Sequence, residues 1–140
     1  QYPAATLIPT TSWQTNIGVY AGEYSVYDLV SGQTYEWSTC TADGGLASYD
    51  TELTLTDLSN NELGYSNDFC GSQSKITWTS TITGTVRVHI TENHCQTNST
   101  NTTLVYKTTT AGTPNLTKQT DNITISGNST KTTSPSCFAA

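Results

Sequence analysis

Three oxygen-bearing side chains, Asp50, Asn67 and Asp68, are the best candidate ligand set in this 140-residue chain. Asp50 opens one alternating segment, and Asn67 and Asp68 end a turn-like segment that is rich in acids and amides. Calcium takes about six to eight oxygen ligands from carboxylates, amides and main-chain carbonyls, so these residues predict a calcium site. The simpler alternative is that Asp50 caps a turn and Asn67-Asp68 forms an Asx turn, because no Asp-x-Asp-x-Asp spacing is present.

The two histidines, His89 and His94, are the candidates for acid–base chemistry. A serine hydrolase of the common elbow type would carry Gly-x-Ser-x-Gly, and this motif does not occur. We therefore expect both histidines to face solvent. Carboxylates for glycoside hydrolysis are present at Asp57, Glu62 and Asp68, but nothing in their spacing selects a pair. The sequence predicts no catalytic residues and no enzyme activity.

The three tryptophans divide into two groups. Trp37 and Trp78 alternate with polar residues inside strand-like segments, so we expect them in the core. Trp13 lies in residues 1–16, which contain two prolines and are predicted to form an extended arm. We expect the apolar side chains of this arm to contact a glycan or another copy of the chain; they are Tyr2, Leu7, Ile8 and Trp13.

An apolar residue at every second position indicates half-buried β-strands that must position these side chains. Tyr35 and Trp37 follow this pattern in segment 33–39, and Leu53 and Leu55 follow it in segment 52–57. Further strand candidates are 23–30, 74–79, 85–91, 102–108 and 122–126. Turn signals every 8–12 residues or so are typical of a β-sandwich.

The composition favours a secreted or cell-surface protein. Hydrophobic residues make up 34% of the chain and charged residues only 11%, with a net charge of −6. The five basic residues are dispersed, which argues against a nucleic-acid partner. No apolar run approaches the roughly 20 residues that a membrane-spanning helix needs.

Four cysteines, Cys40, Cys70, Cys95 and Cys137, allow three pairings in two disulfides. Their wide spacing argues against a zinc site, and disulfides indicate an oxidising compartment. A bond from Cys95 to Cys137 would close the Thr- and Asn-rich extension, residues 96–140, into a loop. Five Asn-x-Ser/Thr sequences are candidates for glycosylation: Asn98, Asn101, Asn115, Asn122 and Asn128.

Four segments resemble the bacterial pre-peptidase C-terminal type of domain, in that family's order. They are GQTYEWSTC (32–40), YDTELTLTD (49–57), YSNDFCG (65–71) and ITWTSTITGTVRVHI (76–90). The resemblance covers residues 21–92 and is strongest to versions in secreted and cell-surface proteins of Bacteroidetes-type bacteria. It implies a jelly-roll-like β-sandwich and a Cys40–Cys70 bond, which leaves Cys95 to pair with Cys137. Family members are usually non-catalytic modules attached to secreted enzymes or adhesins, and some bind calcium. The long C-terminal extension and the lack of an attached enzyme depart from that pattern.

These observations together predict a single extracellular all-β domain, residues 1–140, with about 7–9 strands and two disulfides. We expect a structural or adhesive role. The arm would gain stability by docking either on its own sandwich or on another copy, and we expect the second, with self-association into a surface fibre. The alternative is a glycan- or protein-binding accessory module of a secreted enzyme system. Both versions allow a bound calcium ion, and neither involves a membrane span.

Overall fold

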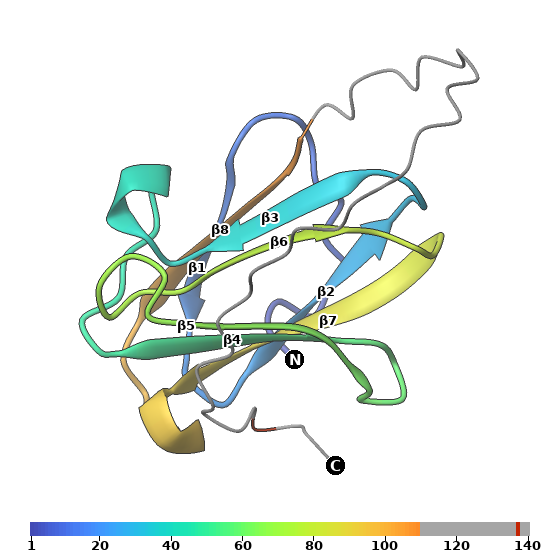
Figure 1. The fold of residues 1–140 in the computed structure, drawn as a ribbon. Helices are drawn as coiled ribbons and strands as arrows, with labels where there is room; N and C mark the ends of the chain where they lie inside the picture. Colours follow the sequence, from blue (N-terminus) through green and yellow to red (C-terminus); the bar gives the residue numbers. More distant parts are fainter. Residues whose placement is uncertain (110–136, 138–140) are drawn as a thin grey trace, which may run out of the picture.

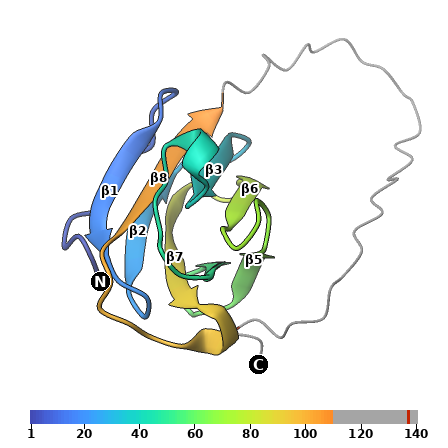
Figure 2. The same ribbon diagram turned by 90° about the vertical axis from the view of Figure 1, so that its left-hand side faces the viewer.

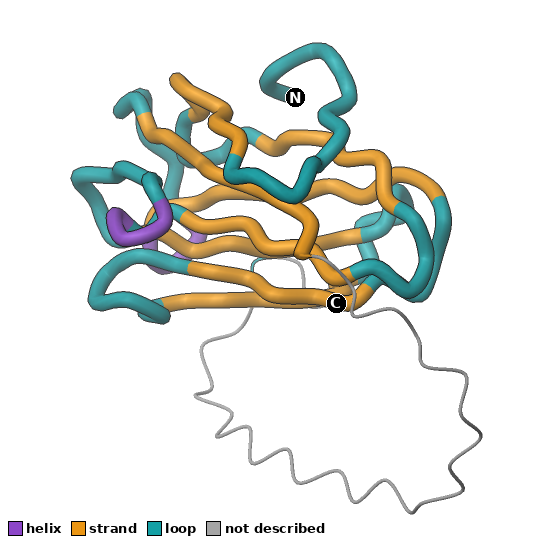
Figure 3. Tube along the Cα trace, turned by 90° about the horizontal axis from the view of Figure 1, so that it is seen from above, coloured by secondary structure: helices purple, strands orange, loops and turns teal. Residues whose placement is uncertain are grey.

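Two antiparallel four-stranded sheets form the protein, as a computed structural model shows for residues 1–109 and residue 137 (Figure 1). The strand order of the first sheet is β1 (Gln14–Val19), β8 (Thr102–Thr109), β3 (Thr34–Ser38) and β6 (Lys75–Thr79). The strand order of the second sheet is β2 (Tyr24–Leu29), β7 (Gly84–Glu92), β4 (Thr51–Thr56) and β5 (Glu62–Asn67). Helix in the described part of the chain is limited to two short 3-10 turns, η1 (Thr41–Asp43) and η2 (Asn93–Cys95) (Figure 3). The all-β sandwich predicted from the alternating segments is confirmed.

The core lies between the two sheets and is built mainly from aromatic and branched side chains. Tyr27 of β2 crosses between the layers: its ring centroid lies 5.5 Å from that of Trp37 and 4.9 Å from that of Tyr106, both edge-on. Leu53 and Leu55 of β4 are fully buried in the same cluster. Burying one such side chain contributes about 1.5–3 kcal/mol, and edge-to-face aromatic pairs add about 0.5–1.5 kcal/mol each.

Two of the eight strands were not expected from the sequence. β1 takes up the last residues of the predicted arm, and β5 occupies residues for which the sequence predicts a turn. Both lie at the edge of their sheets, where only one neighbour constrains the strand. The predicted strand 122–126 lies outside the described residues.

The N-terminal arm docks on its own sandwich, in contrast to the expected docking on a neighbouring copy. The amide of Tyr2 donates to Tyr24 O at 2.8 Å, and the amide of Leu7 donates to Val26 O at 2.8 Å, both on the free edge of β2. The Tyr2 hydroxyl donates to Ile17 O in β1 at 3.0 Å. The arm therefore covers the seam between β1 and β2, beside which it is seen in Figure 2.

Both disulfides pair as predicted. Cys40–Cys70 ties the loop after β3 to the turn after β5. Cys95–Cys137 joins η2 to the C-terminal region. Cross-links that enclose 30 and 42 residues stabilise by about 3–4 kcal/mol each in the chain-entropy model.

Candidate functional site

Three strand ends meet at the candidate ligand residues. Strand β4 begins where its two antiparallel neighbours, β5 and β7, end, with Glu52 opposite Asn67 and Thr51 opposite Glu92. Asp50 directly precedes β4, so it lies between the residues that follow β5 and those that follow β7. We call Asp50, Asn67 and Asp68 the strand-end cluster. The register thus brings together the three residues that the sequence singled out.

Asp50 is held from one side only. Its Oδ2 accepts a hydrogen bond from Asn93 Nδ2 at 3.0 Å, and its main-chain carbonyl accepts one from the Asn93 amide at 3.0 Å. Its other carboxylate oxygen, Oδ1, is buried and has no hydrogen-bond partner. Burial and, next, the negative charge of Asp68 raise the pKa of Asp50 above its usual value. The Asp50 carboxylate is therefore short of positive charge in the protein alone.

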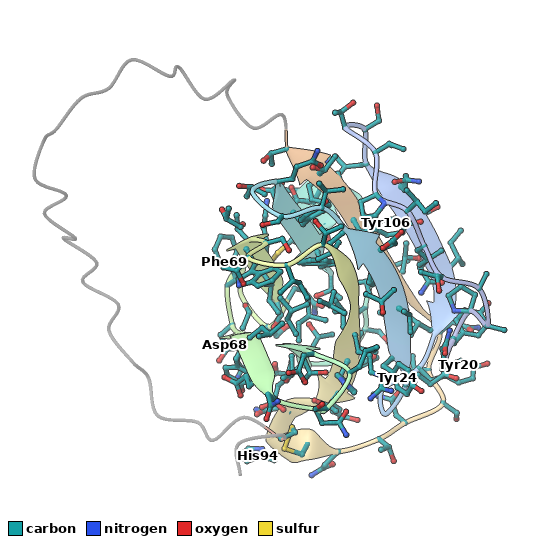
Figure 4. The ribbon with its side chains drawn as sticks, turned by 90° about the vertical axis from the view of Figure 1, so that its right-hand side faces the viewer. Tyr20, Tyr24, Asp68, Phe69, His94 and Tyr106 are labelled. Carbon is teal, nitrogen blue, oxygen red and sulfur yellow. A yellow bond between two sulfur atoms is a disulfide. The ribbon has the colours of Figure 1, made fainter. Side chains whose placement is uncertain are left out.

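Asn67 shows the same deficit. Its Oδ1 is also buried and without a hydrogen-bond partner. A buried acceptor that makes no hydrogen bond costs about 1–3 kcal/mol. Asp68 follows with φ 59°, in the left-handed region, and its side chain is exposed at the turn after β5 (Figure 4). Two orphaned oxygens beside a further carboxylate are an arrangement that a hard cation would satisfy.

The donor set of this cluster fits calcium. Carboxylate and amide oxygens are its usual ligands, and main-chain carbonyls or water complete the six to eight that it takes, about 2.3–2.6 Å away. Asp50 and Asn67 would supply the two orphaned oxygens, and Asp68 would supply an exposed carboxylate. A bound cation would also reverse the electrostatic penalty on Asp50.

Glu52 lies beside this cluster and was not found from the sequence. Its side chain is fully buried, and its carboxylate accepts from the Tyr65 hydroxyl at 3.1 Å, the Thr91 hydroxyl at 3.2 Å, and the amides of His94 and Cys95 at 3.3 and 3.2 Å. Four donors from three elements converge on one acid, which fixes η2 over the sheet. In the alternating segment, Leu53 and Leu55 take the inward positions and Glu52 takes an outward one. The sequence therefore indicates only a polar residue that faces outward.

The acid and two sulfur atoms that lie near one another here do not form a metal site. Ligand atoms of Glu52, Cys95 and Cys137 lie within 4.8 Å of one another. Both sulfurs, however, belong to the Cys95–Cys137 disulfide and cannot act as thiolates. These atoms lie close together because the Glu52 carboxylate accepts a hydrogen bond from the amide of Cys95, one of the two disulfide cysteines.

The expectation that both histidines face solvent is wrong for His89. Its side chain is buried on the outer side of β7, with Nε2 3.0 Å from the Thr56 hydroxyl. Burial, with a smaller contribution from Arg87, lowers the pKa of His89 to about 4, so the ring is neutral at pH 7. His94 is exposed on η2, as expected (Figure 4). The expectation fails because side chains of neighbouring strands flank His89: its ring centroid lies 5.2 Å from that of Tyr24, directly opposite on β2.

The apolar residues of the arm have different surroundings. Leu7 packs against the core, whereas Ile8 is 68% exposed and Tyr2 is 38% exposed. Trp13 is half-buried against the outer face of the first sheet, with the Nζ atoms of Lys107 and Lys75 lying 4.4 and 5.3 Å from its ring centroid. Trp37 is buried in the core as predicted, and Trp78 is partly buried against it. Ile8, Tyr2 and Trp13 thus retain surface for contact.

The glycosylation candidates are only partly covered by the structure. Asn98 is half-buried, and its Nδ2 donates to Glu92 Oε2 at 3.0 Å. Asn101 is exposed directly before β8. The other three candidates lie outside the described residues: Asn115, Asn122 and Asn128.

Two solved structures with low sequence identity are similar to this chain. A pre-peptidase C-terminal domain of a collagenase from Bacillus anthracis has 11% identity and a TM-score of 0.47, and the match covers 77% of this chain and 98% of that domain. PliG from Aeromonas hydrophila, a periplasmic inhibitor of g-type lysozyme, has 12% identity and a TM-score of 0.46, with 74% and 99% covered. The first of these is the type of domain that the sequence motifs resemble.

Other comparisons add a family but no curated relative. No curated protein matches the chain. Within the described residues, no helix is long and apolar enough to cross a membrane. The family model described as "Domain of unknown function (DUF8695)" matches residues 14–113, which span all eight strands. The chain therefore belongs to the DUF8695 family.

Proposed function

We propose that this protein is a non-catalytic extracellular β-domain with a structural or adhesive role, and that the strand-end cluster binds a calcium ion. The observation that carries the calcium site is the pair of buried, unpartnered oxygens, Asp50 Oδ1 and Asn67 Oδ1. Calcium there would link the start of β4 to the end of β5, near the Cys40–Cys70 disulfide. The ion would be structural, since it would connect strand ends and not a reacting group.

The surroundings of the titratable groups support a non-catalytic role. His89 is neutral at pH 7 and buried against Thr56. Glu52 is fully buried, and its carboxylate accepts four hydrogen bonds from protein groups, two of them from amides of η2. Glu36 is bound between Lys75 and Lys107. Each of these groups is engaged by another part of the protein and is not free to transfer a proton to a substrate. This favours a binding domain over an enzyme.

Two disulfides support an extracellular location. They form and persist in oxidising compartments, and they tie both the β3–β5 side of the sandwich and the C-terminal region. A calcium site of modest affinity fits the same setting, because extracellular modules bind calcium with dissociation constants of about 0.1–1 mM.

Thermal unfolding with and without calcium tests this proposal. A hundredfold excess of calcium over Kd stabilises the folded protein by about 2.7 kcal/mol, so we expect the melting temperature to fall by about 10 °C when EDTA replaces it. Asp68→Asn should reduce the calcium-dependent part, while Asp28→Asn, an exposed acid on β2, should not. Identical melting curves in calcium and EDTA would leave only turn capping for these residues.

Self-association by arm exchange is a second candidate, favoured by how the arm binds. Leu7 pairs with the free edge of β2 through main-chain hydrogen bonds, and the same edge of a neighbouring copy would offer identical partners. Exchange of this kind would build dimers or open chains of molecules. Sizing and electron microscopy of the protein with and without residues 1–9 test it. A folded deletion variant that assembles as the parent does would exclude the arm as the connector.

A further inference from the structure

The outer face of the first sheet carries an aromatic ring that charged side chains hold in place. Trp13, directly before β1, lies over the ammonium groups of Lys107 and Lys75. Both ammonium groups bind the Glu36 carboxylate, at 3.1 and 3.5 Å. Because one carboxylate holds both groups, they approach the indole from the same side. The three residues come from the neighbouring strands β8, β6 and β3, so the indole packs over the outer face of this sheet and stays partly exposed.

The charges around this ring cancel. Lys75 also binds Asp43 of η1 at 3.2 Å, so the two lysines face two carboxylates. The chain as a whole carries a net charge of −6, which repels polyanions at longer range. A sulfated or acidic polymer would have to displace Glu36 or Asp43 to reach either lysine. An uncharged ligand meets no such barrier.

Hydroxyl groups continue this surface along the strands. Thr34 of β3 lies directly between Thr79 of β6 and Thr109 of β8, and the hydroxyls of Thr34 and Thr79 are 2.8 Å apart. This row is two residues from Glu36, or about 7 Å along the strand. Sugar rings present apolar C–H faces and many hydroxyls, which suit an indole next to such a row.

We propose that the outer face of the first sheet binds a neutral polysaccharide, with a sugar ring stacked on the exposed part of the Trp13 indole. The threonine row and the edges of the Lys–Glu pairs would take its hydroxyl groups. This inference rests on the adhesive role proposed above and names the chemical class of its partner. It places the polysaccharide on the first sheet, whereas the calcium cluster is on the second.

Affinity electrophoresis in native gels tests this site. The gels contain hydroxyethylcellulose, galactomannan, laminarin, glycol chitin or dextran sulfate, and a gel without polymer is the reference. We expect at least one neutral polymer to retard the wild type, and Trp13→Ala to weaken that binding by about tenfold or more. Trp13→Phe should keep part of the affinity. Phe69→Ala removes another exposed aromatic ring, after β5, and should leave binding unchanged.

Lys107→Gln provides a variant that keeps the indole but loosens it. If the lysine holds the ring flat, this variant should bind several-fold more weakly while its melting curve stays close to that of the wild type. Failure of all neutral polymers to retard the wild type would overturn the proposal. So would retardation by dextran sulfate alone, or equal retardation of the wild type, Trp13→Phe and Lys107→Gln. Calcium titration of the same samples tests the strand-end cluster separately. A failure of the polysaccharide proposal can therefore be told apart from a failure of the calcium proposal.

Discussion

The outer faces of the two sheets handle polar residues in different ways. On the second sheet, the polar residues are buried and bound within the protein. Thr56 and His89 form a hydrogen bond with each other, and Glu52 accepts a hydrogen bond from the His94 amide in η2. On the first sheet, the charged residues Glu36 and Lys107 are paired but remain partly exposed around Trp13. The first arrangement fixes the fold, and the second leaves groups at the surface. The polar side of a strand therefore has opposite roles in the two layers.

The largest expected effect is the removal of the buried acid. Glu52→Ala would leave two main-chain amides and two hydroxyls without their acceptor, so we expect a loss of about 3–4 kcal/mol in the free energy of unfolding. Glu36→Ala, the matched acid of the other face, should cost only about 1–2 kcal/mol. Urea denaturation of both variants measures the difference. Equal losses would break the contrast between the two faces.

The second effect is a pH dependence that only the buried face should show. The pKa of His89 is about 4 in the folded protein against 6.5 as its ordinary value, so between these values the unfolded chain binds a proton that the folded one does not. Stability from this group is therefore complete above pH 6.5 and is lost as the pH falls toward 4. In His89→Gln, the slope of the free energy of unfolding against pH should fall by the equivalent of one bound proton between pH 4 and 6.5. His94→Gln, at an exposed site, is the control, and an unchanged slope in His89→Gln would show that another group titrates.

The smallest effect concerns salt on the open face. The Glu36–Lys107 and Glu36–Lys75 pairs are partly exposed, so their attraction should be screened when NaCl is raised to 1 M. We expect the Glu36→Gln penalty to shrink by under about 1 kcal/mol at high salt, while the Glu52→Gln penalty stays constant. Urea denaturation at two salt concentrations measures both. A salt-sensitive Glu52 would mean that its hydrogen bonds are open to solvent.

The central strands were predictable because their own side chains record the burial. Tyr35 and Trp37 in β3, and Leu53 and Leu55 in β4, alternate with polar residues and all face the core. The edge strands β1 and β5 were not predictable in this way. β1 contains a bulge at Gly18, whose φ is +88°, and β5 contains Gly64, so neither has a clean alternation. Their pairing depends on the neighbouring strand and not on their own pattern.

The candidate site was predictable only in part. Asp50, Asn67 and Asp68 were found because acids and amides at strand ends suggest ligands, and the antiparallel register does bring them together. Glu52 was missed because a covering element, η2, buries the face that alternation marks as polar. Burial of a second face depends on a loop that is distant in sequence, which no local pattern records.

A calcium titration tests the central claim most directly. Isothermal titration calorimetry of calcium into protein dialysed against EDTA should show a single ion bound per chain, with magnesium binding far more weakly. The double variant Asp50→Asn, Asp68→Asn should lose this binding, and Asp28→Asn should keep it. Absence of binding at millimolar calcium, or equal binding by the double variant, would contradict the assignment of the strand-end cluster as a calcium site.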